Sequence, residues 1–138
     1  MQELRTEIEI DATPERVWQV LTDFERYPEW NPFMVSVEGV AREGERLKSR
    51  IGSMTFRPVV LAVDAPRELR WRGRLLLPGV FDGAHRFQIE PLGAERVRFV
   101  QSERFEGLLA LLMTLIGKST RRGFEAMNAA LKQRAEAV

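Results

Sequence analysis

The chain has 138 residues, 44% of them apolar and 30% charged, which is enough for one core and is an ordinary globular composition. Its 21 lysines and arginines nearly balance 20 aspartates and glutamates, so no nucleic-acid partner is expected. There is no cysteine and one histidine, His85, which excludes disulfides, thiol nucleophiles and a cysteine- or histidine-rich metal site. We expect neither metal nor cofactor.

The N-terminal segment is charged and alternating, without an apolar signal core, so we expect a cytoplasmic protein. The most apolar run, 108–116, is far shorter than the roughly twenty residues that cross a bilayer. These features predict one domain over residues 1–138 with no stable membrane insertion.

Alternation of apolar and charged residues over 4–10 predicts a first strand. Thr13 followed by Pro14 is a helix start, because Thr caps a helix and Pro suits its first position. A second short helix is expected through Phe24 and Tyr27, before Pro28 and Pro32 prevent continuation. This region therefore predicts two short helices.

Residues 33–105 contain alternating runs separated by turn signals, which predict six more strands. The clearest puts Leu69, Trp71 and Leu75 on one face and arginines on the other. The runs are 33–37, 47–51, 54–63, 69–75, 83–90 and 97–103.

From Gly107 the period becomes helical, with Phe124, Met127 and Leu131 on one stripe, which predicts a long amphipathic helix. Its first part, 108–116, is apolar on nearly all sides, which indicates burial or a lid over an opening. The order of strand, two short helices, six strands and long helix is an α+β arrangement.

Short turns between the last strands would align Trp71, His85 and Gln101 in one inward row, with Glu103 one step further. His85 is then either a hydrogen-bonding or proton-transferring group in an apolar cavity, or a core histidine bonded to its neighbours. Trp30 either contacts a ligand or closes one end of the sheet with Tyr27.

Two surface features also allow alternatives. The apolar hairpin 75–81 fits a gate, a partner contact or self-packing better than membrane contact. Arginines at positions 70, 72, 74, 86 and 98 share the outer face with nearby glutamates, which indicates a solvated face of mixed charge.

Five segments resemble one known family: IEIDATPERVW at 8–18, YPEWNPF at 27–33, LRWRG at 69–73, GAHRF at 83–87 and FEAMNAALK at 124–132. The family is the SRPBCC superfamily, also called START-like or birch-pollen-allergen-like, and within it the polyketide cyclase/dehydrase and lipid-transport group. The resemblance covers essentially the whole chain. It implies a helix-grip fold, in which a curved seven-stranded antiparallel sheet surrounds the long C-terminal helix and leaves a mostly apolar cavity.

The resulting hypothesis is a carrier or sensor of a small hydrophobic molecule such as a lipid, polyketide, isoprenoid or aromatic compound. Its alternatives are a cyclase or dehydratase with His85 as acid/base, and an interaction module that uses the apolar hairpin. A monomer or weak homodimer is expected. The expected ligand contacts are Trp30, Trp71, His85, Phe87, Phe99, Gln101, Glu103, Leu111, Leu115, Phe124 and Met127.

Overall fold

The structure is a computed structural model that describes residues 2–75 and 81–137. Of residues 2, 74–75, 81–82 and 108–115 it describes the backbone only. The elements are β1 (Gln2–Ile10), α1 (Pro14–Thr22), the 3₁₀ helix η1 (Phe24–Arg26), α2 (Tyr27–Trp30), β2 (Met34–Glu38), β3 (Lys48–Ile51), β4 (Met54–Phe56), β5 (Val59–Asp64), β6 (Glu68–Leu75), β7 (Phe81–Gly93), β8 (Arg96–Gly107) and α3 (Leu108–Glu136). None of the helices within these ranges is long and apolar enough to cross a membrane.

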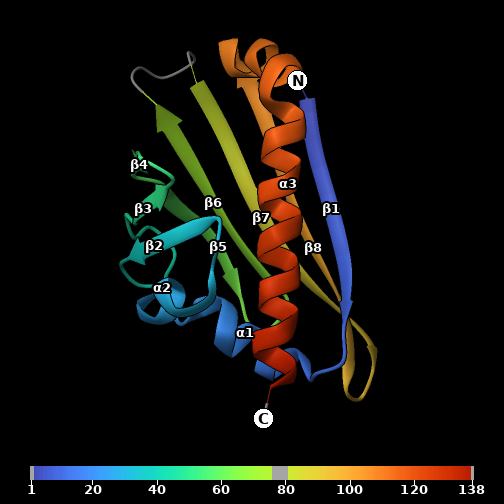
Figure 1. Ribbon diagram of the computed structural model, residues 1–138. Coiled ribbons are helices and arrows are strands. Elements are labelled where there is room, and N and C mark those ends of the chain that lie inside the picture. Colours follow the sequence, from blue (N-terminus) through green and yellow to red (C-terminus); the bar gives the residue numbers. More distant parts are fainter. Residues whose placement is uncertain (1, 76–80, 138) are drawn as a thin grey trace.

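A five-stranded antiparallel sheet in the order β1-β8-β7-β6-β5 forms the larger layer, and α3 runs along one of its faces (Figure 1). A three-stranded sheet, β2-β3-β4, and the short helices lie beside α3 on that same side (Figure 1). The fold is therefore α+β of the helix-grip type, as predicted, with the long helix against the sheet.

The strand count differs from the prediction, because the described part of the chain has eight strands in two sheets instead of seven in one. The run expected as one strand over 54–63 divides at Pro58 into β4 and β5. Proline has no N–H for a central ladder, so a strand commonly ends there. A bridge between Arg46 and Val59 links the two sheets, beside the bond from the Leu47 N–H to the Pro58 carbonyl at 2.8 Å.

The predicted helix start is confirmed, since Pro14 opens α1 and the Thr13 hydroxyl accepts the Arg16 N–H at 3.1 Å. Pro28 does not end the next helix but lies in the first turn of α2. Its missing N–H costs nothing there, because N–H groups of a first turn have no partner within the helix.

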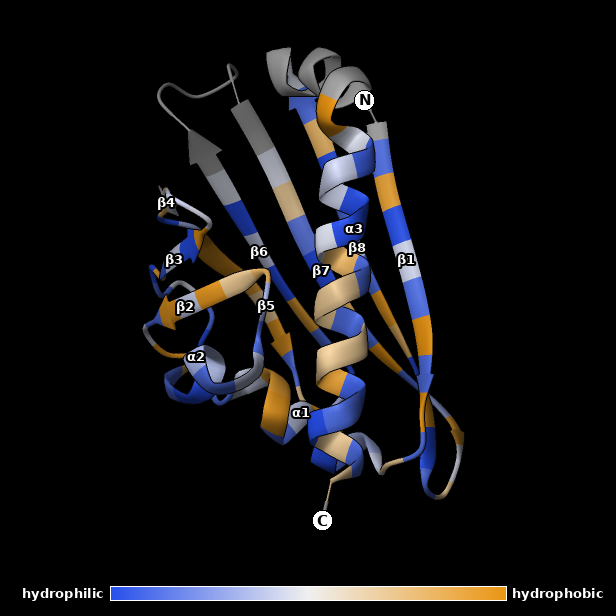
Figure 2. Cartoon of the chain, in the orientation of Figure 1, coloured by the Kyte–Doolittle hydropathy of each residue, from blue (hydrophilic) through white to orange (hydrophobic). Residues whose placement is uncertain are grey.

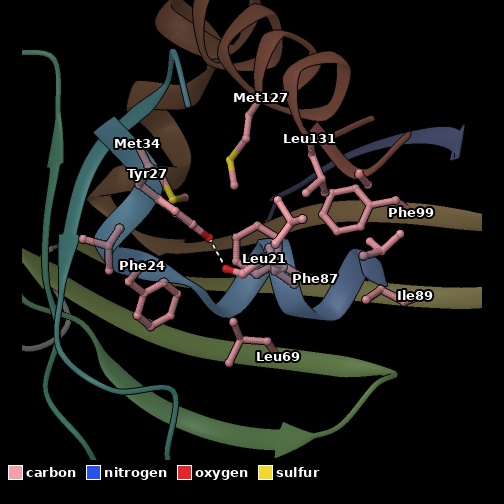
Figure 3. Close-up of a cluster of buried hydrophobic side chains, with 14 of the residues drawn as sticks. Leu21, Phe24, Tyr27, Met34, Leu69, Phe87, Ile89, Phe99, Met127 and Leu131 are labelled. Carbon is pink, nitrogen blue, oxygen red and sulfur yellow. Dashed lines mark hydrogen bonds between the residues drawn. The ribbon is translucent and has the colours of Figure 1, made fainter. Parts of the chain in front are cut away.

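Apolar and polar residues alternate along β1 (Figure 2), and the apolar ones are less exposed than the charged ones between them. Side chains of α1, α2, the larger sheet and α3 converge on one buried cluster (Figure 3). Tyr27 lies fully inside it and donates its hydroxyl to the Leu21 carbonyl at 2.5 Å. Burial raises the pKa of Tyr27 well above its usual range, and the charge of Asp23 adds to the effect.

The C-terminal end of α3 is fastened by polar contacts. Arg16 donates to the carbonyls of Arg134 at 3.2 Å and Ala135 at 3.3 Å. Glu136 accepts the Lys132 ammonium at 2.5 Å and the Asp11 N–H at 2.8 Å. These bonds join the helix end to the chain that connects β1 and α1.

The Glu136 contacts predict a pH effect on stability. The hydrogen bond from Lys132, with that from the Asp11 N–H, lowers the pKa of Glu136 in the folded state. The stabilisation is therefore complete above the pKa of an unfolded glutamate and is lost as the pH falls through the lower folded value. The difference in Tm between wild type and Glu136→Gln should be largest near pH 7 and shrink towards about pH 3. Scanning calorimetry over this range measures it.

Glu43→Gln is the control, because Glu43 is an exposed loop carboxylate with no ion-pair partner among residues 2–75 and 81–137. Its effect on Tm should stay small at every pH. A Glu136→Gln difference that is the same at pH 7 and pH 3 would contradict the proposed contribution of this carboxylate.

Candidate functional site

The pairing of β6, β7 and β8 sets the rows of side chains that face α3. Trp71 lies opposite His85, and His85 lies opposite Glu103. The predicted row of Trp71, His85 and Gln101 is therefore wrong in one member, since Gln101 lies opposite Phe87 in the next row. The cause is the hairpin, which turns at residues 94–95 and not at 91–93.

His85 is 3% exposed and lies among aromatic rings. Its ring centroid is 4.6 Å from that of Phe87, 5.0 Å from that of Phe124 and 5.7 Å from that of Trp71. Its Nε2 atom is 2.8 Å from Oε1 of Gln101. The structure thus brings these residues together, although Gln101 meets His85 diagonally and not directly across the strands.

A chain of buried polar groups continues from Gln101 to α3 and β1. The Gln101 amide donates to Asn128 Oδ1 at 2.7 Å. The Asn128 amide donates to Thr6 Oγ1 at 2.9 Å, and the Thr6 hydroxyl donates to the Gln101 carbonyl at 3.1 Å. All three side chains are buried, so each of these bonds replaces a lost bond to water.

The direction of the hydrogen bonds in this series of polar groups follows from its last acceptor, the Gln101 carbonyl. A backbone carbonyl only accepts, so Thr6 must donate its proton to the Gln101 carbonyl and accept from the Asn128 amide. The Asn128 oxygen then faces the Gln101 amide nitrogen, which leaves the Gln101 side-chain oxygen for His85. His85 consequently carries a proton on Nε2, and its tautomer is fixed by contacts that reach α3.

The other ring nitrogen faces Glu103, with His85 Nδ1 3.5 Å from Glu103 Oε2. The Glu103 side chain is 21% exposed, whereas that of His85 is 4% exposed. His85 is the only polar partner of this carboxylate within the described part of the chain. Glu103 is therefore the more exposed end of this series of polar groups.

Two glycines, which carry no side chain, lie opposite each other on the inner face of the sheet beside this pair and are called the bare row below. Gly73 of β6 lies opposite Gly83 of β7, one row beyond Trp71 and His85. A Cβ atom built on Gly73 would meet none of the described atoms within 4 Å. Phe105 of β8 continues the row and is 4% exposed. The described residues therefore leave the inner face open at Gly73, and the side chains of residues 108–115 of α3 lie outside the described residues.

The remaining expected contacts divide into three groups. Four lie in the packed interior at 0% exposure: Phe87, Phe99, Phe124 and Met127. Figure 3 shows Phe87, Phe99 and Met127 in the buried cluster. Leu111 and Leu115 belong to α3, but their side chains lie outside the described residues. Trp30 is half-buried, packs on Tyr27 with ring centroids 5.1 Å apart, and borders a surface hollow with Arg16 and Asp23. This position fits the closing role of Trp30 better than the ligand contact.

Sequence reasoning missed Thr6, Gly73, Gly83 and Asn128 as parts of the site. Asn128 follows Phe124 by four residues, so it extends the apolar stripe of α3 with an amide. An amide at such a position signals a buried polar partner. The two glycines had no signal of their own, because only the register places them opposite each other.

The outer face of the sheet carries a separate hollow of about 290 Å³. Glu68 accepts from Arg86 at 2.6 Å and lies 3.9 Å from Arg70, so charges of both signs pair there as expected. The lining residues used below are Arg5, Leu61, Arg70, Arg72, Arg86, Arg104 and Glu106.

The chain matches one known protein family over nearly its whole length. The model of the family described as polyketide cyclase/dehydrase and lipid transport matches residues 1–136. No curated protein matches the chain in sequence.

Solved structures from several bacteria share the fold. A hypothetical protein of Helicobacter pylori aligns with 17% identity and a TM-score of 0.82, over 98% of this chain and 88% of its own. The Zhui aromatase/cyclase of Streptomyces aligns with 20% identity and a TM-score of 0.76, over 98% and 93%. A Thermus thermophilus protein aligns with 27% identity and a TM-score of 0.72, over 99% and 98%.

Proposed function

Because the chain belongs to the polyketide cyclase/dehydrase and lipid transport family, we propose that it binds a small hydrophobic molecule between its larger sheet and α3, as a carrier or sensor. The observation that carries this proposal is the bare row of Gly73 and Gly83 on the inner face. Aromatic side chains of Trp71 and Phe105 flank it, and Glu103 supplies a polar group beside it.

The chemistry of this space suits an apolar guest with one polar group. Burial of apolar ligand surface contributes roughly 25 cal/mol per Å² before the costs of association. A few polar groups then fix the orientation of the ligand, as in most small-molecule sites. Trp71 and Phe105 supply the apolar wall, and the His85 and Glu103 pair supplies the polar group.

Filling the bare row should weaken binding. Gly73→Phe places a ring in the open space, so the affinity for the neutral fluorescent probe N-phenyl-1-naphthylamine should fall by roughly tenfold or more. Gly93→Phe is the matched control, since a Cβ at Gly93 also meets no described atom within 4 Å but lies in the β7–β8 hairpin. Fluorescence titration measures both. Equal affinities of the two variants, both folded by circular dichroism, would refute this location.

A second candidate function is acid/base catalysis on a polyketide-like substrate, and the His85 and Glu103 pair is the observation that favours it. Nε2 of His85 bonds Gln101 and Nδ1 faces Glu103, so Glu103 would contact the substrate and His85 would act through it. Under the carrier proposal, His85→Ala alters ligand affinity or stability only. Loss of turnover on a polyketide-like substrate with affinity retained would favour the enzyme.

The interaction-module alternative stays a prediction. The apolar hairpin on which it depends includes residues 76–80, which lie outside the described residues. The expected monomer or weak homodimer likewise stays a prediction, which sedimentation velocity at several protein concentrations would measure.

A further inference from the structure

We infer that this ligand space selects apolar molecules that carry a hydroxyl or another hydrogen-bond donor, and that it rejects carboxylates through Glu103. The inference rests on the proposed function and names the class of ligand for the same site. It follows from three features of the described residues: the direction of the buried polar chain, the free oxygen of Glu103 and the placement of the arginines.

The polar chain decides what the His85 and Glu103 pair offers to a ligand. Nε2 of His85 donates its proton to Gln101, and Nδ1 of the same ring lies 3.5 Å from Oε2 of Glu103. Oε2 therefore faces the imidazole, and Oε1 is the oxygen that remains for a ligand. A carboxylate oxygen accepts hydrogen bonds and has no proton to donate.

Oε1 of Glu103 has no hydrogen-bond partner in the part of the chain that the structure describes. On the inner face Glu103 lies between His85 of β7 and Leu4 of β1, with Phe105 two residues further along β8. An acceptor in such apolar surroundings gains most from a donor that a ligand brings. A hydroxyl on an apolar body meets this requirement.

The arginines that could bind an anion lie on the opposite face. Arg70, Arg72, Arg86 and Arg104 of β6, β7 and β8 line the outer hollow. The inner rows beside the bare glycines contain no lysine or arginine among the described residues. A ligand carboxylate in the inner space would thus meet no lysine or arginine of these rows and would face the Glu103 oxygen, and two acceptors cannot form a hydrogen bond with each other.

Three naphthalenes of similar shape test the inference at pH 7 by competition with N-phenyl-1-naphthylamine. The wild type should bind 2-naphthol at least tenfold more tightly than 2-methoxynaphthalene, which lacks the donor, and 2-naphthoate most weakly. Glu103→Gln keeps the shape and removes the charge, so the naphthoate should then bind about as well as the methoxy compound. Glu106→Gln is the matched control, because Glu106 belongs to the same strand but lines the outer hollow.

The outcomes separate the inference from the function on which it rests. Similar affinities for all three compounds, or tightest binding of 2-naphthoate, would overturn the inference and leave ligand binding in place. Binding of none of them, and no binding of the fluorescent probe either, would overturn the proposed function and the inference with it. An equal effect of Glu103→Gln and Glu106→Gln would also overturn the inference.

Discussion

Replacing Asn128 with leucine should lower the free energy of unfolding by about 2 to 4 kcal/mol, although the two side chains are similar in size. The Gln101 amide would lose its 2.7 Å acceptor, and the Thr6 hydroxyl would lose its 2.9 Å donor. Both groups would stay buried with one bond each, from the Gln101 amide to the Phe124 carbonyl at 3.4 Å and from the Thr6 hydroxyl to the Gln101 carbonyl at 3.1 Å. A buried hydrogen-bonding group that loses its partner costs about 1 to 3 kcal/mol. Urea unfolding followed by circular dichroism measures the change.

A double-mutant cycle tests whether the loss comes from the bond itself. If Thr6 is already valine, the Asn128→Leu change removes one bond fewer. The loss of unfolding free energy in the double variant should therefore be about 1 kcal/mol smaller than the sum of the losses in the two single variants. Ser102→Ala is the control partner, because Ser102 is buried on the outer-facing side of β8, away from α3. Additive effects of Thr6→Val and Asn128→Leu would contradict the bond between them.

Phe124→Ala should have a still larger effect, about 3 to 5 kcal/mol, since it removes a fully buried ring. The ring joins α3 to the site, with centroids 5.0 Å from His85 and 5.5 Å from Phe33. Phe33→Ala removes a ring from the same contact, but Phe33 is only partly buried, so its cost should be clearly smaller. Chemical denaturation of both variants measures the difference, and equal costs would show that Phe124 is not the buried member of the pair.

In several strands the period of the sequence was sufficient to predict which face turns inward, although the two faces of the run 54–63 could not be distinguished. Alternation in the strands around Trp71 and His85 placed both residues on the face towards α3, as the structure has them. The helical stripe of Phe124, Met127 and Leu131 was equally clear, and all three are fully buried. These patterns are local, so they require no knowledge of which strands are neighbours.

The register and the buried polar chain could not be predicted in the same way. A hairpin whose centre lies one residue further along the chain moves every partner by two residues, which placed Glu103 and not Gln101 opposite His85. The contact between Gln101 and Asn128 depends on how α3 lies across the sheet. Such contacts join residues far apart in the chain, so the periodicity of the sequence does not predict them.

Similarity to solved structures shows the fold of the protein, whereas particular residues define its candidate site. A TM-score of 0.76 to an aromatase/cyclase at 20% identity shows a shared fold, which many chemistries can use. The specific features of this chain are the glycines of the bare row and the polar chain that ends at Glu103. The proposed choice of ligand depends on these residues and not on the fold as a whole.

The location of a bound ligand tests the central claim most directly. Intermolecular nuclear Overhauser effects between 2-naphthol and the isotope-labelled protein report which side chains the ligand contacts. We predict contacts with the ring protons of Trp71 and Phe105, which flank the bare glycine row on the inner face. Contacts with the methyl groups of Leu61, which lines the outer hollow, and none with Trp71 or Phe105 would contradict the account.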